Sequence, residues 1–349
     1  MAYTTIKKPS DYFNTKLYTG NGTTDTAQTG VGFQPDWTII KARSIGYNNN
    51  VFDAVRGSTK RIMTDVTNAE STQAEMVKSF DSDGFTLGND AGVNANTETF
   101  VAWNWKANGA GSANTDGSIN TTSTSVNTTA GFSISKFTGT GANATVGHGL
   151  GVAPSMIIVK NLSISSQWWV YHASLGATKS LNLNATDAEQ TVSVIWNNTA
   201  PTSSVFSVGT GNEVNGSGNS MIAYCFAEKT GYSKFGSYTG NGNADGTFVY
   251  TGFKPAFVMI KDSTSAGLMW NIRDNKRDTF NPNDTVLYPN SSEVENAHGD
   301  NDVDWLSNGF KMRSTNGHTN ASGDTYIFMA FAEEPLVANV GSSIPATAR

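Results

Sequence analysis

The sequence predicts an all-β protein: tandem antiparallel β-sandwich units, jelly-roll-like, that arise from a threefold internal repeat. A glycine turn, a proline and an apolar strand that ends in lysine occur together three times, at 31–41, 148–160 and 251–261. Runs of β-branched and aromatic residues, separated by Gly, Asn and Ser, follow each copy, as is typical of strands joined by turns. One short segment, 73–77, is the only one in which we expect a helical turn.

Each copy opens with a short strand that runs into a glycine-rich turn, at 16–22, 135–141 and 236–242. The Asn-Gly and Thr-Gly pairs supply the positive φ angles that tight turns need. In the central strand that follows, the proline stands at the first residue, where no ladder donor is required. We therefore interpret the glycine motif as a turn and not as a phosphate-binding loop, which needs a following helix and lysine.

The next segment alternates polar and apolar residues, most clearly at 268–274, and corresponds to 51–57 and 167–172. This period of two predicts a strand with one buried face. A short apolar piece and an acidic loop come after it. Two further strands then close each copy, and we expect the aromatic residues of the last one to face the interior of a sandwich.

The interval between the first two copies is the longer one because of a polar Gly, Ser, Thr and Asn run at 107–130. We interpret this run as a flexible linker or long loop. Only a few residues join the second and third copies, which we expect to pack closely. The predicted divisions are an N-terminal anchoring arm at 1–14, sandwich units at 15–116, 131–230 and 231–335, and a C-terminal tail at 336–349.

Composition excludes several classes of protein. The formal net charge is −6 and only 15% of residues are charged, so no basic field attracts nucleic acid or an anionic membrane. No apolar run is long enough for membrane insertion. The single cysteine, Cys225, permits neither an internal disulfide nor a cysteine zinc site. The first residues lack the apolar segment of a secretory signal, so we expect assembly in a cytoplasm.

No catalytic or cofactor-binding pattern is present. The four histidines lie in different elements of their copies and lack metal-binding spacing. Asp300, Asp302 and Asp304 offer alternating oxygen ligands, but the glycine and closing glutamate of an EF-hand are missing. We interpret them as a solvated acidic turn with weak calcium potential. We expect no cofactor, no metal and no enzymatic activity.

Aromatic residues are the more suggestive candidates for binding. Four of them lie in corresponding segments of the second and third copies: Trp168, Trp169, Tyr171 and Trp270. Aromatic faces stack on sugar rings and dominate many interfaces, so these residues are candidate surface or glycan contacts. The alternative is that they fill sandwich cores. At the N-terminus, the candidate anchors to a larger particle are Tyr3, Tyr12 and Phe13.

A set of motifs gives the chain a family resemblance: Tyr18–Gly22, Gly32–Asp36, Phe80–Phe85, Ala102–Lys106 and Met329–Glu333. Together they resemble a repeated β-domain of tailed-phage virion proteins, tail fibre-like structural proteins mostly from phages of marine bacteria and cyanobacteria. The resemblance covers nearly the whole chain. It implies a location in the virion, after assembly in the host cytoplasm, and it carries over no catalytic residue.

The resemblance leads to an expected function. We expect a tail fibre or tail-associated appendage subunit that contacts other virion proteins and a host cell-surface glycan or protein. A homotrimer is expected by analogy with such fibres. One alternative is a head decoration or cement protein. The second is a polysaccharide-degrading tail enzyme, which is disfavoured because the groups that could act in catalysis differ between the copies.

Overall fold

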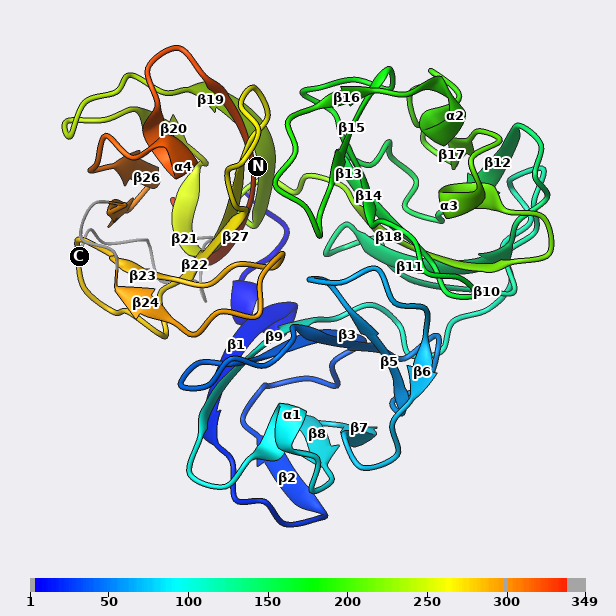
Figure 1. The fold of residues 1–349 in the computed structure, drawn as a ribbon, viewed down its shortest axis with the longest axis horizontal. Coiled ribbons are helices and arrows are strands. Elements are labelled where there is room, and N and C mark those ends of the chain that lie inside the picture. The colour runs from blue at the N-terminus through cyan, green and yellow to red at the C-terminus, as the bar shows by residue number, and fades with distance from the viewer. Residues whose placement is uncertain (1–3, 298–300, 338–349) are drawn as a thin grey trace.

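The computed structural model describes residues 4–297 and 301–337, and nearly all of its regular structure is antiparallel β-sheet (Figure 1). This confirms the predicted all-β fold. Among these residues, helix is limited to single turns: η1 (Pro9–Asp11), α1 (Ala91–Asn94), α2 (Ser193–Trp196), α3 (Asn212–Asn215) and α4 (Gly317–Asn320). The expected helical turn at 73–77 is absent, and residues 74–75 form a turn that leads into a strand. No helix in the described ranges is long and apolar enough to cross a membrane.

Three large sheets form the inner layer of the molecule. In unit 1 (residues 13–105) the order is β1 (Phe13–Thr19), β9 (Thr99–Trp105), β3 (Trp37–Ala42), β4 (Asn50–Asp53), β5 (Lys60–Met63) and β6 (Ser71–Thr72). In unit 2 (residues 107–226) it is β10 (Ser123–Asn127), β11 (Phe132–Thr138), β18 (Ser220–Phe226), β13 (Met156–Asn161), β14 (Trp169–His172), β15 (Lys179–Asn182) and β16 (Gln190–Thr191). In unit 3 (residues 233–335) it is β19 (Ser233–Thr239), β27 (Thr325–Pro335), β21 (Phe253–Asp262) and β22 (Asn271–Asp274). In each unit the closing strand lies beside the central strand: β9 lies between β1 and β3, β18 between β11 and β13, and β27 between β19 and β21.

A smaller sheet covers the outer face of each large one (Figure 1). These sheets are β2 (Thr26–Thr29), β8 (Gly84–Leu87) and β7 (Val77–Asp81) in unit 1, β12 (Ala144–Gly147) and β17 (Val205–Val208) in unit 2, and β20 (Phe248–Tyr250), β26 (Gly309–Met312) and β25 (Val303–Leu306) in unit 3. A further pair in unit 3 is β23 (Thr285–Val286) with β24 (Asn296–Ala297). Each unit is therefore a two-layer sandwich.

Glycine is required where β8, the middle strand of the small sheet of unit 1, leaves the turn from β7. A Cβ atom on Gly84 would lie 1.9 Å from the carbonyl oxygen of Gln28 on the neighbouring strand. No side chain fits in that space. The sequence Ser82-Asp83-Gly84-Phe85 thus marks a close approach of two backbones as well as a hairpin turn.

The closing strands are buried on both faces. In β9, Phe100 and Ala102 point into the sandwich core of unit 1, whereas Trp103 and Trp105 point the other way. The second set joins one large apolar cluster to which all three units contribute. The units therefore share a central core, which explains why the three lobes in Figure 1 surround a common centre.

The polar run at 107–130, expected to be a flexible linker or a long loop, is a loop with isolated bridges as far as residue 122 and then forms a strand. It contains β10, which pairs with β11 at the edge of the large sheet of unit 2. The Ala107 and Gly109 amides donate to the carboxylate of Asp36, at 2.6 and 3.0 Å. Because an edge strand needs few apolar side chains, composition alone did not reveal it.

Candidate functional site: the junction of the three units

All four aromatic residues proposed as surface contacts are buried: Trp168, Trp169, Tyr171 and Trp270. The expectation of an exposed contact is corrected, and the alternative that they fill cores holds. Adjacent residues of a strand point to opposite faces. Trp168 lies in the central core and Trp169 in the sandwich core of unit 2, because both faces of this sheet are covered.

Trp168 and Trp270 also bind polar groups across the junctions between units. The indole N–H of Trp168 in unit 2 donates to the Met63 carbonyl of unit 1 at 2.8 Å. The indole N–H of Trp270 in unit 3 donates to the Asn182 carbonyl of unit 2 at 2.9 Å. A buried indole N–H usually finds such a partner. Each tryptophan therefore fixes its unit onto the preceding one.

Unit 1 closes the cycle with an asparagine. The Asn49 side chain is buried, and its amide nitrogen donates to three carbonyls of unit 3: Tyr288 at 3.1 Å, Pro289 at 3.3 Å and Ser291 at 2.9 Å. Unit 2 thus reaches into unit 1, unit 3 into unit 2, and unit 1 into unit 3. The contacts run in one direction around a closed ring.

The lysines that end the three central strands follow the same cycle. Lys41, Lys160 and Lys261 have no exposed surface. Each ammonium donates to a carbonyl of its own unit and to one of the neighbour. The contacts to the neighbouring unit are Lys160 to Thr67 at 2.9 Å, Lys41 to Ser292 at 2.8 Å and Lys261 to Thr186 at 3.4 Å. The lysine near the end of each of the three central strands thus has the same structural role in every unit.

Burial lowers the pKa of each of these lysines to about 8. In the unfolded chain the ordinary value is about 10.5. Between these values the unfolded chain holds the protons that the folded chain has released, so the free energy of unfolding should rise with pH. Each lysine adds a slope of at most about 1.4 kcal/mol per pH unit.

Urea unfolding at pH 7.5, 8.5 and 9.5 checks this rise. Lys160→Met should reduce the slope of the free energy of unfolding against pH. Lys8→Met, a change of an exposed lysine, should leave this slope unchanged. The range stops below pH 10 because burial raises the pKa of several tyrosines, Tyr224 among them, which reverses the trend at higher pH. A wild-type stability that falls between pH 7.5 and 9.5 would contradict the assignment.

A buried ion pair of unit 1 is the hydrogen-bond partner of a tyrosine of unit 2. Asp53 and Arg56 lie three residues apart, and their side chains are fully buried and in contact at 2.5 Å. The Tyr224 hydroxyl of unit 2 donates to the same carboxylate at 2.7 Å, and Glu70 lies 3.2 Å from the guanidinium. Burial alone would lower the pKa of Arg56, but its acidic neighbours more than offset this and raise it.

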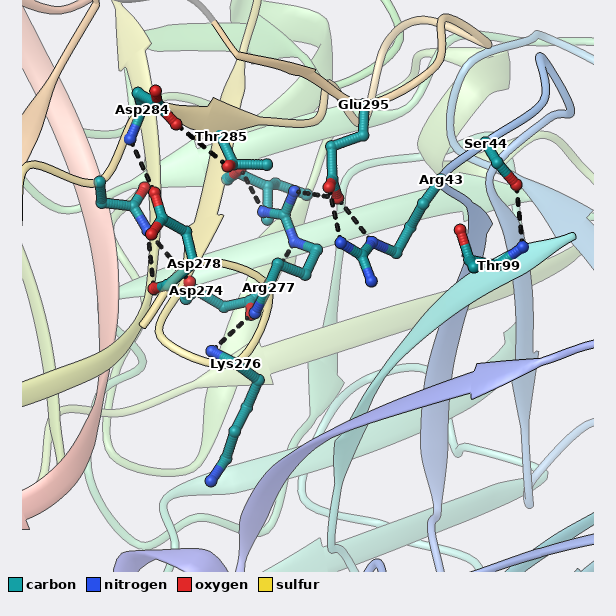
Figure 2. A network of polar contacts seen from close by, with 12 residues as sticks. Arg43, Ser44, Thr99, Asp274, Lys276, Arg277, Asp278, Asp284, Thr285 and Glu295 are labelled. Carbon is teal, nitrogen blue, oxygen red and sulfur yellow. Dashed lines mark hydrogen bonds and ion pairs between the residues drawn. The ribbon is translucent and has the colours of Figure 1, made fainter. Parts of the chain in front are cut away.

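Units 1 and 3 are joined by the corresponding pair. Asp274 contacts Arg277 at 2.5 Å and accepts the indole N–H of Trp103 of unit 1 at 2.9 Å. Figure 2 shows Arg277 of unit 3 and Arg43 of unit 1 approaching the Glu295 carboxylate from two sides. Both Arg43 bonds to this carboxylate measure 2.7 Å. The first and last units of the chain are thus held together by a shared charge network.

At the junction of units 2 and 3 a histidine takes the place of the aspartate. His172 ends β14, as Asp53 ends β4 and Asp274 ends β22. His172 is buried, and its Nε2 lies 3.2 Å from the Phe328 carbonyl of unit 3. Its Nδ1 accepts the Ser174 amide, so the proton resides on Nε2. Burial lowers the pKa of His172 to about 4, which keeps the ring neutral. A groove lies nearby, lined by residues that include Ser174, Leu175, Lys179, Glu189, Ser263 and Thr264.

The N-terminal candidates pack against the protein itself. Phe13 is buried in the central core beside Trp105 and Phe331, with ring centroids 5.0 and 5.2 Å apart. Tyr12 meets Tyr232 edge-on at 6.0 Å. Phe13 therefore attaches unit 1 to unit 3 and is not exposed to a particle, whereas Tyr12 is half-buried and its role as an anchor stays a prediction. Tyr3 lies outside the described residues.

The acidic turn carries no assembled metal site in the part of the chain that the structure describes. Asp304 pairs with Arg313 at 3.2 Å. Asp302 lies in the loop before β25, and Asp300 is outside the described residues. Because Asp300 lies outside the described residues, the weak calcium potential of this turn stays a prediction.

The fold and the junction together define a class: a single-chain all-β protein in which three sandwich units close around one core. The family described as Domain of unknown function (DUF7483) matches residues 8–335, and the chain belongs to this family. The match runs from the residue before η1 to the last residue of β27, so it spans the whole three-unit body. No curated protein matches the chain.

Proposed function

We propose that this protein is a structural component of a phage particle, a tail fibre or tail-associated appendage subunit that contacts the host surface. The proposal rests on the role of the buried polar groups described above, which connect the units. The lysines, the tryptophan N–H groups and the two Asp–Arg pairs all join units to one another. Such an interior builds a rigid body and leaves its outer surfaces for contacts.

The sequence resemblance supports the location, and the composition supports the role. Low charge and Asn, Thr and Gly surfaces suit a binding appendage that attaches to other virion proteins and to a host glycan or protein. Three units of one chain already surround a common core. A homotrimer of this chain would therefore form through the outer faces of whole three-unit bodies.

Quantitative mass spectrometry of purified particles, with immunogold labelling, tests this proposal. We expect the protein at a few to tens of copies per particle, confined to the tail. Hundreds of copies over the capsid would identify a head decoration or cement protein instead. Absence from particles would overturn the virion assignment altogether.

A further inference from the structure

The exposed aromatic side chains of the described residues gather in unit 3. Phe248, Tyr250 and Phe280 are 43%, 54% and 78% exposed. The other large apolar residues exposed to this degree are aliphatic: Val152, Ile164, Val194 and Val337. Exposed aromatic groups are costly to keep in water, and Phe248 and Tyr250, which lie two residues apart on one strand, together indicate a contact surface.

Phe248 and Tyr250 stand on the outward face of the small sheet β20-β26-β25. They flank Val249, which points into the sandwich core. The spacing of i and i+2 on a strand places their Cα atoms about 7 Å apart. Phe280 lies beside β25, on the side of the sheet away from β20, because the side chain of the next residue, Asn281, both donates to and accepts from the Trp305 backbone, at 2.9 and 2.8 Å.

A glycine lies between these aromatic residues and β25. Gly309 lies directly opposite Tyr250 in the register, and Leu306 is the next residue across the sheet. A Cβ on Gly309 would lie 3.1 Å from the Phe248 ring and 2.1 Å from the Val249 carbonyl oxygen. The glycine therefore lets the Phe248 ring and the β20 backbone approach the β26 backbone closely, and half-buried Leu306 lies on the far side of Gly309.

The charged groups around this face are already paired. Lys311, which lies opposite Phe248, contacts Asp245 at 2.5 Å. On the next strand, Asp304 pairs with Arg313 at 3.2 Å. Paired charges make a nearly neutral rim that neither attracts nor repels an ionic partner strongly.

Units 1 and 2 have no such face. The register places Ala27 and Thr29 of β2, and Thr145 and Gly147 of β12, at the positions that Phe248 and Tyr250 occupy in unit 3. The small sheet thus folds equally with small residues there. The two aromatic residues are not needed by the sandwich and require another explanation.

We propose that the outer face formed by Phe248, Tyr250, Gly309 and Leu306 binds a neutral glycan. The proposal rests on the proposed host-surface role and names its ligand class. Sugar rings are amphipathic: their C–H faces stack on aromatic rings and their hydroxyls bond to the polar rim. A purely apolar partner would leave the ion pairs of the rim desolvated, and an acidic glycan would find no free cation among the rim groups named above.

The test uses the full chain on an array of purified neutral and acidic bacterial polysaccharides. The wild type should bind neutral glycans. The variant Phe248→Ala/Tyr250→Thr, which carries the unit 1 residues at these positions and should fold, should bind at least about tenfold more weakly. Val152→Ser, a matched exposed apolar residue at 44% exposure in unit 2, should bind as the wild type does.

Absence of neutral-glycan binding by the wild type, or equal binding by the double variant, would overturn the inference. Self-association in sedimentation that the double variant abolishes would also overturn it and identify a second copy as the occupant. A protein confined to the tail but without glycan binding would refute this inference alone. A glycan-binding protein absent from particles would refute only the proposed function.

Discussion

Trp105→Ala should lower the free energy of unfolding by about 3–5 kcal/mol, the usual cost of removing a large buried aromatic side chain. The ring lies 4.4 Å from Trp37 of its own unit and 5.7 and 5.8 Å from Phe257 and Phe331 of unit 3. The substitution therefore empties a space between units and not within one sandwich. Urea unfolding followed by circular dichroism measures the loss.

Val152→Ala is the matched control, because this side chain is exposed and its truncation should change stability by less than about 0.5 kcal/mol. A loss for Trp105→Ala that is no greater than for the control would mean that the central core does not stabilise the protein.

Arg56→Met should be comparably severe, at about 3–5 kcal/mol. It removes the guanidinium and leaves the Asp53 carboxylate buried, with the Tyr224 hydroxyl but without a cation. Removing both charges, as Asp53→Asn/Arg56→Met, should restore about half of the loss, because no uncompensated charge then remains.

Lys8→Met tests the same type of interaction at the surface. Lys8 and Asp11 pair at 3.1 Å with both side chains at least half exposed, so the change should cost less than about 0.5 kcal/mol. If Arg56→Met cost no more than this, the Asp53–Arg56 pair would have no role in joining units 1 and 2.

Much of the fold was predictable, because alternation and turn chemistry are local properties of the sequence. The central strands and the closing strands formed where they were expected. Residues such as Trp103 and Trp105 were expected inside a sandwich, yet they face the neighbouring units. A strand buried on both faces has no polar side that identifies which core each residue enters.

The candidate site was predictable only in part. Trp168 and Trp270 were recognised as corresponding residues, but burial depends on what covers the sheet, which sequence spacing does not report. The three lysines were a signal for buried contacts, because a charged residue recurs at the end of each apolar central strand. Phe248 and Tyr250 were missed because they flank a single apolar residue in a short strand, and their exposure is evident only once the register is known.

The claim that the three units form one body is tested most directly by hydrogen exchange of Trp105→Ala, measured by mass spectrometry. Residues of β3, β13 and β21, one central strand from each unit, report separately on the three sandwiches. If the units unfold together, protection should fall by the same free energy in all three strands. Loss of protection in β3 alone, with β13 and β21 unchanged, would show that the units are independent and would contradict this account.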